Sequence, residues 1–442
     1  MANGVGPPIK DLGGYFRIFA IFLSAFSSSA LPQIEGSAGQ TGTKPFTATV
    51  AIREGYDSNP LTQSYQSNQD IQSSTYSSIQ PSLGYNYTGL QADAAFRYDF
   101  SGTYYPSINQ SYDIQYAQTL NGRYTYAVDP RTSFTLADVF LYTEQPLVQS
   151  FVQQGITPFF NTSTMNNLAT VEADYRVTDR LSMITRWNNT LVYLGGNSSN
   201  NNYMNNGAFQ QFRLDFTPET VGTVSFDYQI YDYDNDNTYR DNQQVALSFG
   251  ADHTFLPTLF FSGRAGIQLN DNFGLADNDV IVGTGGLGSG EQEIGVNPFA
   301  SISSTWSYEQ KSFVSAGFSM QVQQSNLATS ADSQAYTINL NWDHQFTEKL
   351  SVIQSFFVNL AVFTPELSQS QTQSLYPGAV YQGSGQQTTV TYQCKFAYEF
   401  FPYLSAELGW SYTSYGSYFD LNNGNGGSYT RNQIYLGVRG TY

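Results

Sequence analysis

Cysteine and histidine, the side chains that most often cross-link a fold or carry enzyme chemistry, are nearly absent from this sequence. A single cysteine, Cys394, stands in 442 residues, so no disulfide can form within the chain. The two histidines, His253 and His344, leave little material for a histidine-based metal site or a catalytic triad, and no serine motif accompanies either of them. The sequence therefore predicts a protein that is not an enzyme and has no cofactor.

Charged residues are also scarce. They make up 12% of the chain, about half the share that is usual in soluble proteins. The 18 lysines and arginines form no cluster, which argues against binding to nucleic acid, because nucleic-acid binders gather basic residues on one surface. The net charge of −17 either serves solubility or marks acidic external loops that divalent cations bridge to lipopolysaccharide and other outer-membrane lipid.

Long hydrophobic runs are the third absence. The longest apolar stretch, Ile18 to Phe26, follows Lys10 and Arg17 and precedes the small residues Ser27 to Ala30. This order of basic, apolar and small residues is typical of a secretory signal peptide. We therefore expect residues 1–30 to be a signal peptide that directs export.

The position of cleavage is less sharply defined than the signal itself. Gly36 to Ala38 offers a second cleavage site, and a short buried helix is the alternative to a signal peptide. With cleavage after Ala30, residues 31–44 would be a short N-terminal segment. The apolar stretch is too short for a membrane-spanning helix, which needs about 20 residues. A mature chain embedded in a membrane would therefore have to be a closed barrel.

Aromatic and uncharged polar residues take the place of the missing charges. Aromatic residues make up 16% of the chain, with 34 tyrosines and 32 phenylalanines. This mixture is typical of a barrel with a wet interior and an outer surface bordered by aromatic rings.

Apolar and polar residues alternate along most of the chain from Pro45 onward. The alternation is clearest between Ala92 and Tyr104, where Phe96, Tyr98 and Phe100 alternate with Arg97 and Asp99. Successive side chains of a strand point to opposite faces, so one face is apolar and the other polar. We expect Phe96 to face lipid and Arg97 to face the interior.

Tight-turn motifs separate these alternating segments at regular intervals, and longer polar stretches lie between them. The turns are Thr88-Gly89, Asp129-Pro130-Arg131, Thr178-Asp179-Arg180, Pro218-Glu219-Thr220, Leu256-Pro257-Thr258, Glu309-Gln310-Lys311, Thr347-Glu348-Lys349 and Phe401-Pro402-Tyr403. Eight hairpins with a first and a last strand predict an all-β fold, a transmembrane antiparallel up-and-down β-barrel of about 18 strands over residues 45–442, with 16 strands as the alternative. Strands of 10 to 14 residues suit a membrane crossing of about 9–11 residues. Short turns at one end and long loops at the other are typical of the bacterial outer membrane.

The chain ends on an alternating segment, with Ile434, Leu436, Val438 and the terminal Tyr442 on one face. A terminal aromatic strand resembles the signal by which the barrel-assembly machinery recognises its substrates. An exposed strand of this kind would expose a soluble protein to aggregation. We therefore expect this machinery to be a partner during assembly.

A short motif follows the first expected strand: Gly55-Tyr56-Asp57-Ser58-Asn59-Pro60. It resembles an early motif of the β-barrel porin 2 family, and the general layout of that family is similar over residues 46–442. The resemblance implies an outer-membrane barrel with no catalytic residues to transfer. From the residues alone, Asp57, Ser58 and Asn59 suit the start of a loop.

Charged residues on the polar face are the candidate pore lining. They are Arg53, Asp93, Arg97, Asp99, Asp174, Arg186, Arg213, Asp215, Arg264 and Arg439, with Glu172 beside them. Rings of charge set the ion preference of a pore. The alternative is that these charges pair across strands and only fill the wall.

Two loops carry further candidate sites. The segment from Gln145 to Asn161 is unusually apolar, and its Leu147, Phe151, Phe159 and Phe160 would either fold inward as a constriction or pack over the rim. The stretch containing Asp232, Asp234 and Asp236 resembles the start of a calcium loop, but it lacks the glycine and glutamate that complete one. A solvated loop is the expected reading, with calcium as the alternative.

Together these features predict an outer-membrane porin, a passive diffusion channel for small hydrophilic solutes or ions, which could assemble as a homo-oligomer. A barrel of 16 to 18 strands leaves an aqueous channel. The alternative is a structural or surface-interaction barrel with a plugged lumen: an anchor, an adhesin or an accessory to polysaccharide export.

Overall fold

The structure is a computed structural model that describes residues 45–62, 71–108, 113–144, 163–195, 202–234, 241–271, 295–324, 332–363, 384–419 and 428–442. The expected signal peptide and the segment 31–44 lie outside the described residues. Within the described part, no helix is long and apolar enough to cross a membrane.

The described residues form one antiparallel sheet of 18 strands, the number predicted, and the alternative of 16 is wrong. In chain order the strands are β1 (Phe46–Asp57), β2 (Ser74–Thr88), β3 (Ala92–Tyr104), β4 (Ile114–Asp129), β5 (Thr132–Thr143), β6 (Thr164–Arg176), β7 (Leu181–Leu194), β8 (Tyr203–Thr217), β9 (Thr220–Tyr233), β10 (Asn242–Leu256), β11 (Leu259–Asp271), β12 (Gly295–Glu309), β13 (Ser312–Gln324), β14 (Asp332–Gln345), β15 (Leu350–Phe363), β16 (Gly385–Phe401), β17 (Leu404–Phe419) and β18 (Ser428–Thr441). They run from 12 to 17 residues: eleven have the expected 10 to 14, and seven are one to three residues longer. The extra length lets strands continue beyond the hydrocarbon layer.

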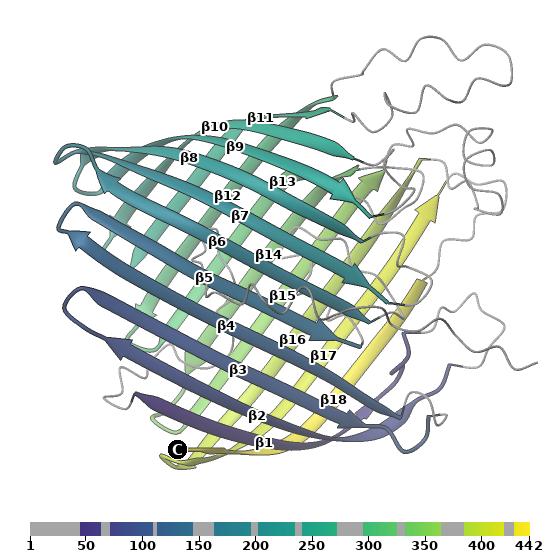
Figure 1. Cartoon of the computed structure of the whole chain (residues 1–442). Helices are drawn as coiled ribbons and strands as arrows, with labels where there is room; N and C mark the ends of the chain where they lie inside the picture. The colour runs from purple at the N-terminus through teal and green to yellow at the C-terminus, as the bar shows by residue number, and fades with distance from the viewer. Residues whose placement is uncertain are drawn as a thin grey trace, which may run out of the picture.

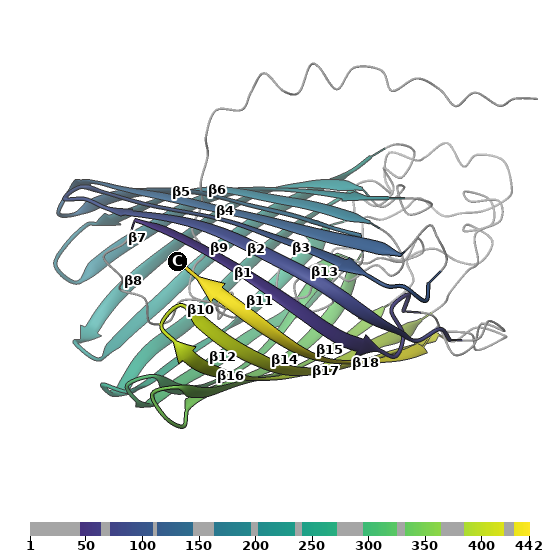
Figure 2. The same cartoon turned by 90° about the horizontal axis from the view of Figure 1, so that it is seen from below.

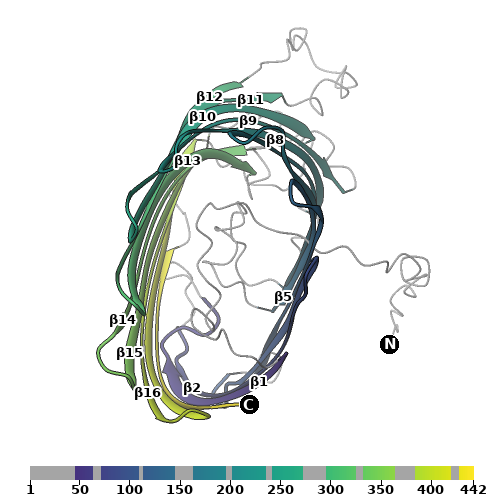
Figure 3. The ribbon, with the colours of Figure 1, turned by 90° about the vertical axis from the view of Figure 1, so that its left-hand side faces the viewer.

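The sheet closes on itself to form a barrel. Each strand pairs with its neighbours in the chain, and β1 also pairs with β18, from Thr49↔Thr441 to Asp57↔Gln433. The strands cross the barrel obliquely, and a view along the barrel shows an oval cross-section (Figures 1 and 3). Closure leaves no edge strand with unpaired backbone groups, as a strand structure in lipid requires.

The two ends of the barrel differ. Eight connections of two to four residues join the strands in pairs at one end, at the eight predicted turns, and the strand ends that the longer segments join lie at the other end (Figures 1 and 2). Turn chemistry explains the tight ones: the Asp129 carboxylate accepts a hydrogen bond from the Arg131 amide at 2.7 Å, and Thr178 accepts one from the Leu181 amide at 3.0 Å. The first strand begins and the last strand ends at the tight-turn end.

The strand pleat sorts the side chains onto two faces, as the alternation predicted. The register places Phe96 opposite Tyr85, and Arg97 opposite Gly84. Phe96 shares the outer face with exposed apolar side chains around the barrel, such as Ile52 and Leu436. The inner face carries mainly polar groups, so the apolar surface of this fold lies on its outside.

The C-terminal residue takes part in closing the barrel. The Tyr442 amide donates to the Ala48 carbonyl at 2.8 Å, and the Ala48 amide donates to the Tyr442 carbonyl at 3.3 Å, while the Tyr442 ring is exposed. Deleting Tyr442 should therefore lower the yield of folded barrel far more than deleting one residue from Gly424 to Gly427, which lies outside the described strands. Heat-modified migration of the folded barrel in gels measures this yield, and equal yields would contradict a closing role for Tyr442.

Candidate functional site

The structure places all ten predicted pore-lining residues on the inner face of the barrel. Most stand between two outward apolar or glycine residues, the exceptions being Arg53 beside Glu54 and Arg186 beside Thr185, and each stands in register with other inner-face positions on the adjoining strands. The residues are Arg53 on β1, Asp93, Arg97 and Asp99 on β3, Asp174 on β6, Arg186 on β7, Arg213 and Asp215 on β8, Arg264 on β11 and Arg439 on β18. They are thus spread around the wall rather than gathered in one place.

The buried carboxylate of Glu407 on β17 joins two of these arginines. Arg53 Nη2 lies 2.9 Å from Glu407 Oε2, and Arg439 Nε lies 2.6 Å from Glu407 Oε1. The guanidinium of Arg53 also lies over the ring of Tyr435, 4.4 Å from its centroid. This group spans β17, β18 and β1, so it ties the inner wall together across the closure of the barrel.

Two further arginines pair with carboxylates close by. Arg97 binds Asp99 on the same strand through two nitrogens, at 2.8 and 2.9 Å. Arg186 Nε donates to Glu172 Oε2 on the neighbouring strand β6 at 2.8 Å. Such pairs cancel much of the field that each arginine would otherwise project into the lumen.

The last two predicted arginines share one partner that the sequence did not single out. Arg213 and Arg264 lie 3.9 and 4.0 Å from Asp252 on β10, which is 8% exposed. Asp252 Oδ1 also accepts a hydrogen bond from Ser262 at 2.7 Å. All six predicted arginines therefore have a carboxylate partner, which agrees with the alternative that the wall charges pair across strands.

The predicted acids behave differently from the arginines. Within the described residues, Asp93, Asp174 and Asp215 make no ion pair, and each stands two or three residues from the tight-turn end of its strand. Arg123 on β4 is an exposed inner-face arginine with no ion pair in the described part of the chain, and the sequence prediction missed it. Its odd-numbered place in an alternating strand was the signal that could have revealed it. The charges without ion pairs are mostly negative.

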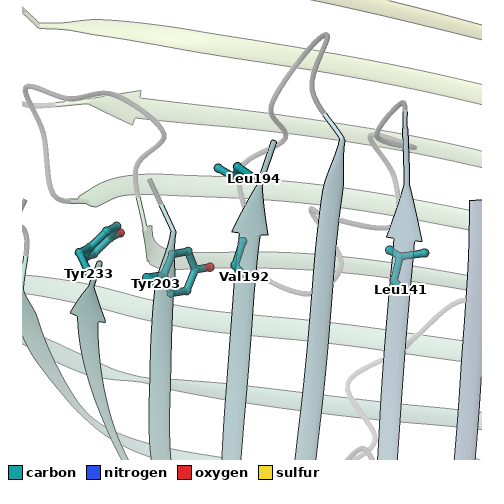
Figure 4. Packing of buried hydrophobic residues seen from close by; sticks show 5 residues of the cluster. All are labelled: Leu141, Val192, Leu194, Tyr203 and Tyr233. Carbon is teal, nitrogen blue, oxygen red and sulfur yellow. The ribbon is translucent and has the colours of Figure 1, made fainter. Parts of the chain in front are cut away.

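A group of apolar side chains interrupts the polar inner face near the long-loop end. It consists of Leu141, Val192, Leu194, Tyr203 and Tyr233, each at most 7% exposed. Figure 4 shows them at the loop ends of neighbouring strands, with the opposite wall of the barrel behind. We call this group the mouth cluster. The predicted constriction residues Leu147, Phe151, Phe159 and Phe160 lie outside the described residues.

The motif that begins at Gly55 supplies a second inner-face cluster. Asp57 is fully buried, and its carboxylate accepts hydrogen bonds from Arg431 at 2.6 Å, Gln433 at 2.8 Å and the Tyr105 hydroxyl at 3.2 Å. The Asn59 amide donates to it at 3.0 Å, which is the expected loop-start turn. Because Arg431 and Gln433 belong to β18, this cluster fastens the first strand to the last.

Gly55 is required by the same packing. A Cβ atom at this position would meet the Ile434 carbonyl oxygen at 2.5 Å and the Tyr76 ring at 2.7 Å. Any larger side chain would push β1 away from β18 or displace the ring. The glycine of the motif is therefore a closure residue.

The candidate calcium residues are only partly described. Asp232 ends the outer face of β9, Asp234 follows that strand, and Asp236 lies outside the described residues. In the described part of the chain, no three metal-ligating side chains form a group that could hold an ion. The pKa of the nearby Asp241 is raised to about 6. Burial is the largest cause, and the neighbouring Asp232 carboxylate adds to it, while a hydrogen bond from the Tyr233 amide offsets part of the rise.

Both histidines lie near the tight-turn end, where His253 contacts a hydroxyl group on the adjacent strand β9 and His344 one on β12, two strands away. His253 Nδ1 is 2.8 Å from the Thr220 hydroxyl, and His344 Nδ1 is 2.9 Å from the Tyr308 hydroxyl. Stacked and edge-on rings surround His344, including Trp342. Each imidazole therefore has a hydroxyl partner within the aromatic zone of the outer wall.

The outer surface decides where this barrel resides. Large apolar and aromatic side chains, among them Ile52, Phe249, Ile338 and Leu408, stand exposed on strands all around it. Water would not tolerate such a continuous apolar surface, whereas lipid requires it. The protein is an outer-membrane β-barrel. Its tight turns, the start of β1 and the end of β18 lie on one side of the membrane. The strand ends that the longer segments join lie on the other side.

Comparisons with known proteins assign this chain to no family. No family model and no curated protein matches the chain. Among solved structures it is similar to the siderophore receptor PirA from Pseudomonas aeruginosa, with a TM-score of 0.42, 10% identity, and coverage of 90% of this chain and 80% of that one. It is also similar to the FrpB iron transporter from Neisseria meningitidis, with a TM-score of 0.41, 9% identity, and coverage of 90% and 81%. Similarities this low carry no argument about substrate.

Proposed function

We propose that this outer-membrane barrel is a porin, a passive diffusion channel for small hydrophilic solutes or ions. The observation that carries the proposal is the inner wall of the closed 18-stranded barrel, which presents mainly charged and other polar side chains between the tight-turn end and the mouth cluster. Barrels of this size leave an aqueous channel. The resemblance of Gly55 to Pro60 to the β-barrel porin 2 family is in keeping with this function.

Carboxylates that make no ion pair within the described residues favour a local preference for cations near the tight-turn end. The six arginines that would attract anions are only partly offset by four carboxylates, because Glu407 and Asp252 each pair with two of them while Asp99 and Glu172 pair with one each. The carboxylates of Asp93, Asp174 and Asp215 have no such partners within the described residues and stand toward the tight-turn mouth. Acidic groups around a pore raise the local concentration of cations.

A structural barrel with a closed lumen is the second candidate, and the mouth cluster favours it. Side chains such as Val192, with no exposed surface, do not line open water. The two candidates differ in one measurable quantity, which is the ionic current through a single barrel.

Purified protein should conduct ions across a planar lipid bilayer, with a reversal potential that indicates a cation preference. Asp215→Asn should lower that preference measurably, because it removes a carboxylate without an ion pair from the inner wall. Asp179→Asn is the matched control, since Asp179 lies in an exposed turn outside the barrel. Absence of current from folded protein would favour the structural barrel. An equal shift of the reversal potential in both variants would contradict a role of the inner-wall carboxylate in cation preference.

A further inference from the structure

One sector of the lipid-facing surface is polar. On strands β5 to β8, which lie side by side on the near wall in Figure 1, outer positions hold Asp138, Asn167, Asn189, Asn206 and Gln210. We call these five residues the polar sector. The corresponding outer positions of β13 and β14 on the far wall are apolar, as with Phe318, Ile338 and Leu340.

The register fixes these residues on the outer face. Asp138 stands opposite Gly122 and Ala169, and Asn189 stands opposite Ala169 and Asn206, so the polar side chains share one face of the sheet. The exposed rings of Phe134 on β5 and Trp187 on β7 occupy the same face. The polar sector therefore belongs to the surface that the rest of the barrel offers to lipid.

The polar sector also lies at the depth of the hydrocarbon layer. Asp138 is the seventh of the 12 residues of β5, and Gln210 is the eighth of the 15 residues of β8. Along β5, the outer neighbours of Asp138 are Leu136 and Phe140, and along β8 Gln210 stands between Ala208 and Phe212. Apolar residues thus flank the polar groups on both sides, which excludes a position in the headgroup region.

Hydrogen bonds within the wall satisfy only part of this sector. Asn167 donates to Asp138 Oδ1, and Asn189 donates to Asn206 Oδ1 at 2.9 Å. Within the described residues, Oδ2 of Asp138 and Nδ2 of Asn206 have no hydrogen-bond partner. A carboxyl oxygen and an amide that face acyl chains would each carry the cost of an unmade hydrogen bond.

Small residues lie beside the polar groups on the same face. The outer positions there include Gly122, Ala169, Ala173 and Ala208. Small residues let two protein surfaces approach closely in a membrane, where lipid offers no hydrophobic force to drive them together. The polar groups and the small side chains therefore both point to contact with protein rather than with lipid.

We propose that the polar sector is the contact between two copies of this barrel, related by a two-fold axis along the membrane normal. All copies insert in the same orientation, so a second copy presents the same groups at the same depth. An axis between β6 and β7 exchanges β5 with β8. It thereby brings Asp138 of each copy, a hydrogen-bond acceptor, toward Gln210 of the other at similar depth. Gln210 Nε2 donates one hydrogen to the Ile184 carbonyl at 3.1 Å, and its Oε1 accepts from the Thr185 hydroxyl at 2.7 Å, so the second N–H of Nε2 is the donor for this contact.

Cysteine cross-linking in intact outer membranes tests the contact, and the native Cys394 supplies the control. In a Cys394→Ala background, Ala169→Cys lies near the proposed axis and should form a disulfide-linked dimer under mild oxidation. The native chain should form no disulfide-linked dimer under the same treatment, because Cys394 stands on the outer face of β16, away from the sector. Monomer only, from folded Ala169→Cys barrel, overturns the proposal, as does a mixed disulfide with a different protein.

A second measurement tests the polar groups themselves. Asp138→Leu or Gln210→Leu should weaken association of folded barrels in detergent about tenfold or more, as expected for a lost hydrogen bond to a charged group. Gln354→Leu is the matched control, because Gln354 is likewise an outer-face amide bonded within the wall, to Tyr392, but stands on β15, outside the polar sector. Association that is unchanged by Asp138→Leu, or equally weakened by Gln354→Leu, contradicts the proposed contact.

Discussion

Arg431→Met should destabilise the barrel by about 3–5 kcal/mol, the usual cost of removing one member of a buried ion pair. Asp57 has no exposed surface, and Arg431 supplies Nε at 3.0 Å and Nη2 at 2.6 Å to its carboxylate. Without the arginine, a buried carboxylate would keep only neutral donors. Unfolding in urea, measured with the barrel in lipid vesicles, gives the free energy directly.

The loss should begin where β1 meets β18. The Asp57 cluster lies at the long-loop end of this junction, next to the hydrogen bond from the Ser58 amide to the Asn432 carbonyl at 2.9 Å. In Arg431→Met, hydrogen exchange should therefore speed up first at the amides of β1 and β18. Uniform exchange around the barrel would argue against a local closing role.

Two variants serve as controls for this prediction. The double variant Asp57→Asn with Arg431→Met removes both charges, so it should recover part of the lost stability. Arg131→Met removes an exposed arginine that lies 3.9 Å from the carboxylate of the exposed Asp179, and it should change stability by less than about 1 kcal/mol. If Arg131→Met proved as costly as Arg431→Met, the effect would not come from the closing cluster.

The barrel itself follows from the sequence because its signals are local. An alternating segment such as Ala92 to Tyr104 needs only the strand pleat to define two faces, and turn residues such as Asp129 and Pro130 act on their own backbone. Eight such turns determined the strand number, and both the faces of β3 and the turn positions are confirmed.

The partners on the inner wall could not be predicted in the same way. Arg431 stands 374 residues from Asp57, and the two meet only because β18 closes against β1 in one particular register. The pairing of Arg264 with Asp252 likewise depends on the register between β10 and β11. A sequence gives the face of each charge, whereas its partner depends on alignment across strands.

Polar residues at outer-face positions depart from the alternating pattern, and these departures point to a surface that the alternation alone does not predict. Asp138 interrupts the apolar series Phe134, Leu136, Phe140 on the outer face of β5, and this exception is visible in the sequence. Its meaning emerges only when the barrel sets it beside Asn167 and near Asn189 on adjacent strands. A single polar residue in one strand is ambiguous, but a polar sector across four strands is a surface.

Phe96→Arg and Arg97→Glu, on adjacent residues, should have opposite consequences. A charged residue on the lipid face costs about 2–4 kcal/mol near the midplane and less toward the interface. Phe96 is the fifth of the 13 residues of β3, somewhat nearer the tight-turn end, so about 2 kcal/mol is expected for Phe96→Arg. Folded yield in lipid vesicles should fall accordingly, whereas Phe96→Leu should assemble normally.

Arg97→Glu should leave folding nearly intact and change the current instead. The substitution breaks the bidentate pair with Asp99 and places two like charges on an inner wall that water can screen. The wall gains negative charge at this point, so the reversal potential should shift toward cations by more than it does for Arg97→Gln, which removes one charge only. If Phe96→Arg assembles as well as the native chain while Arg97→Glu leaves the selectivity unchanged, then β3 does not separate lipid from a water-filled pore.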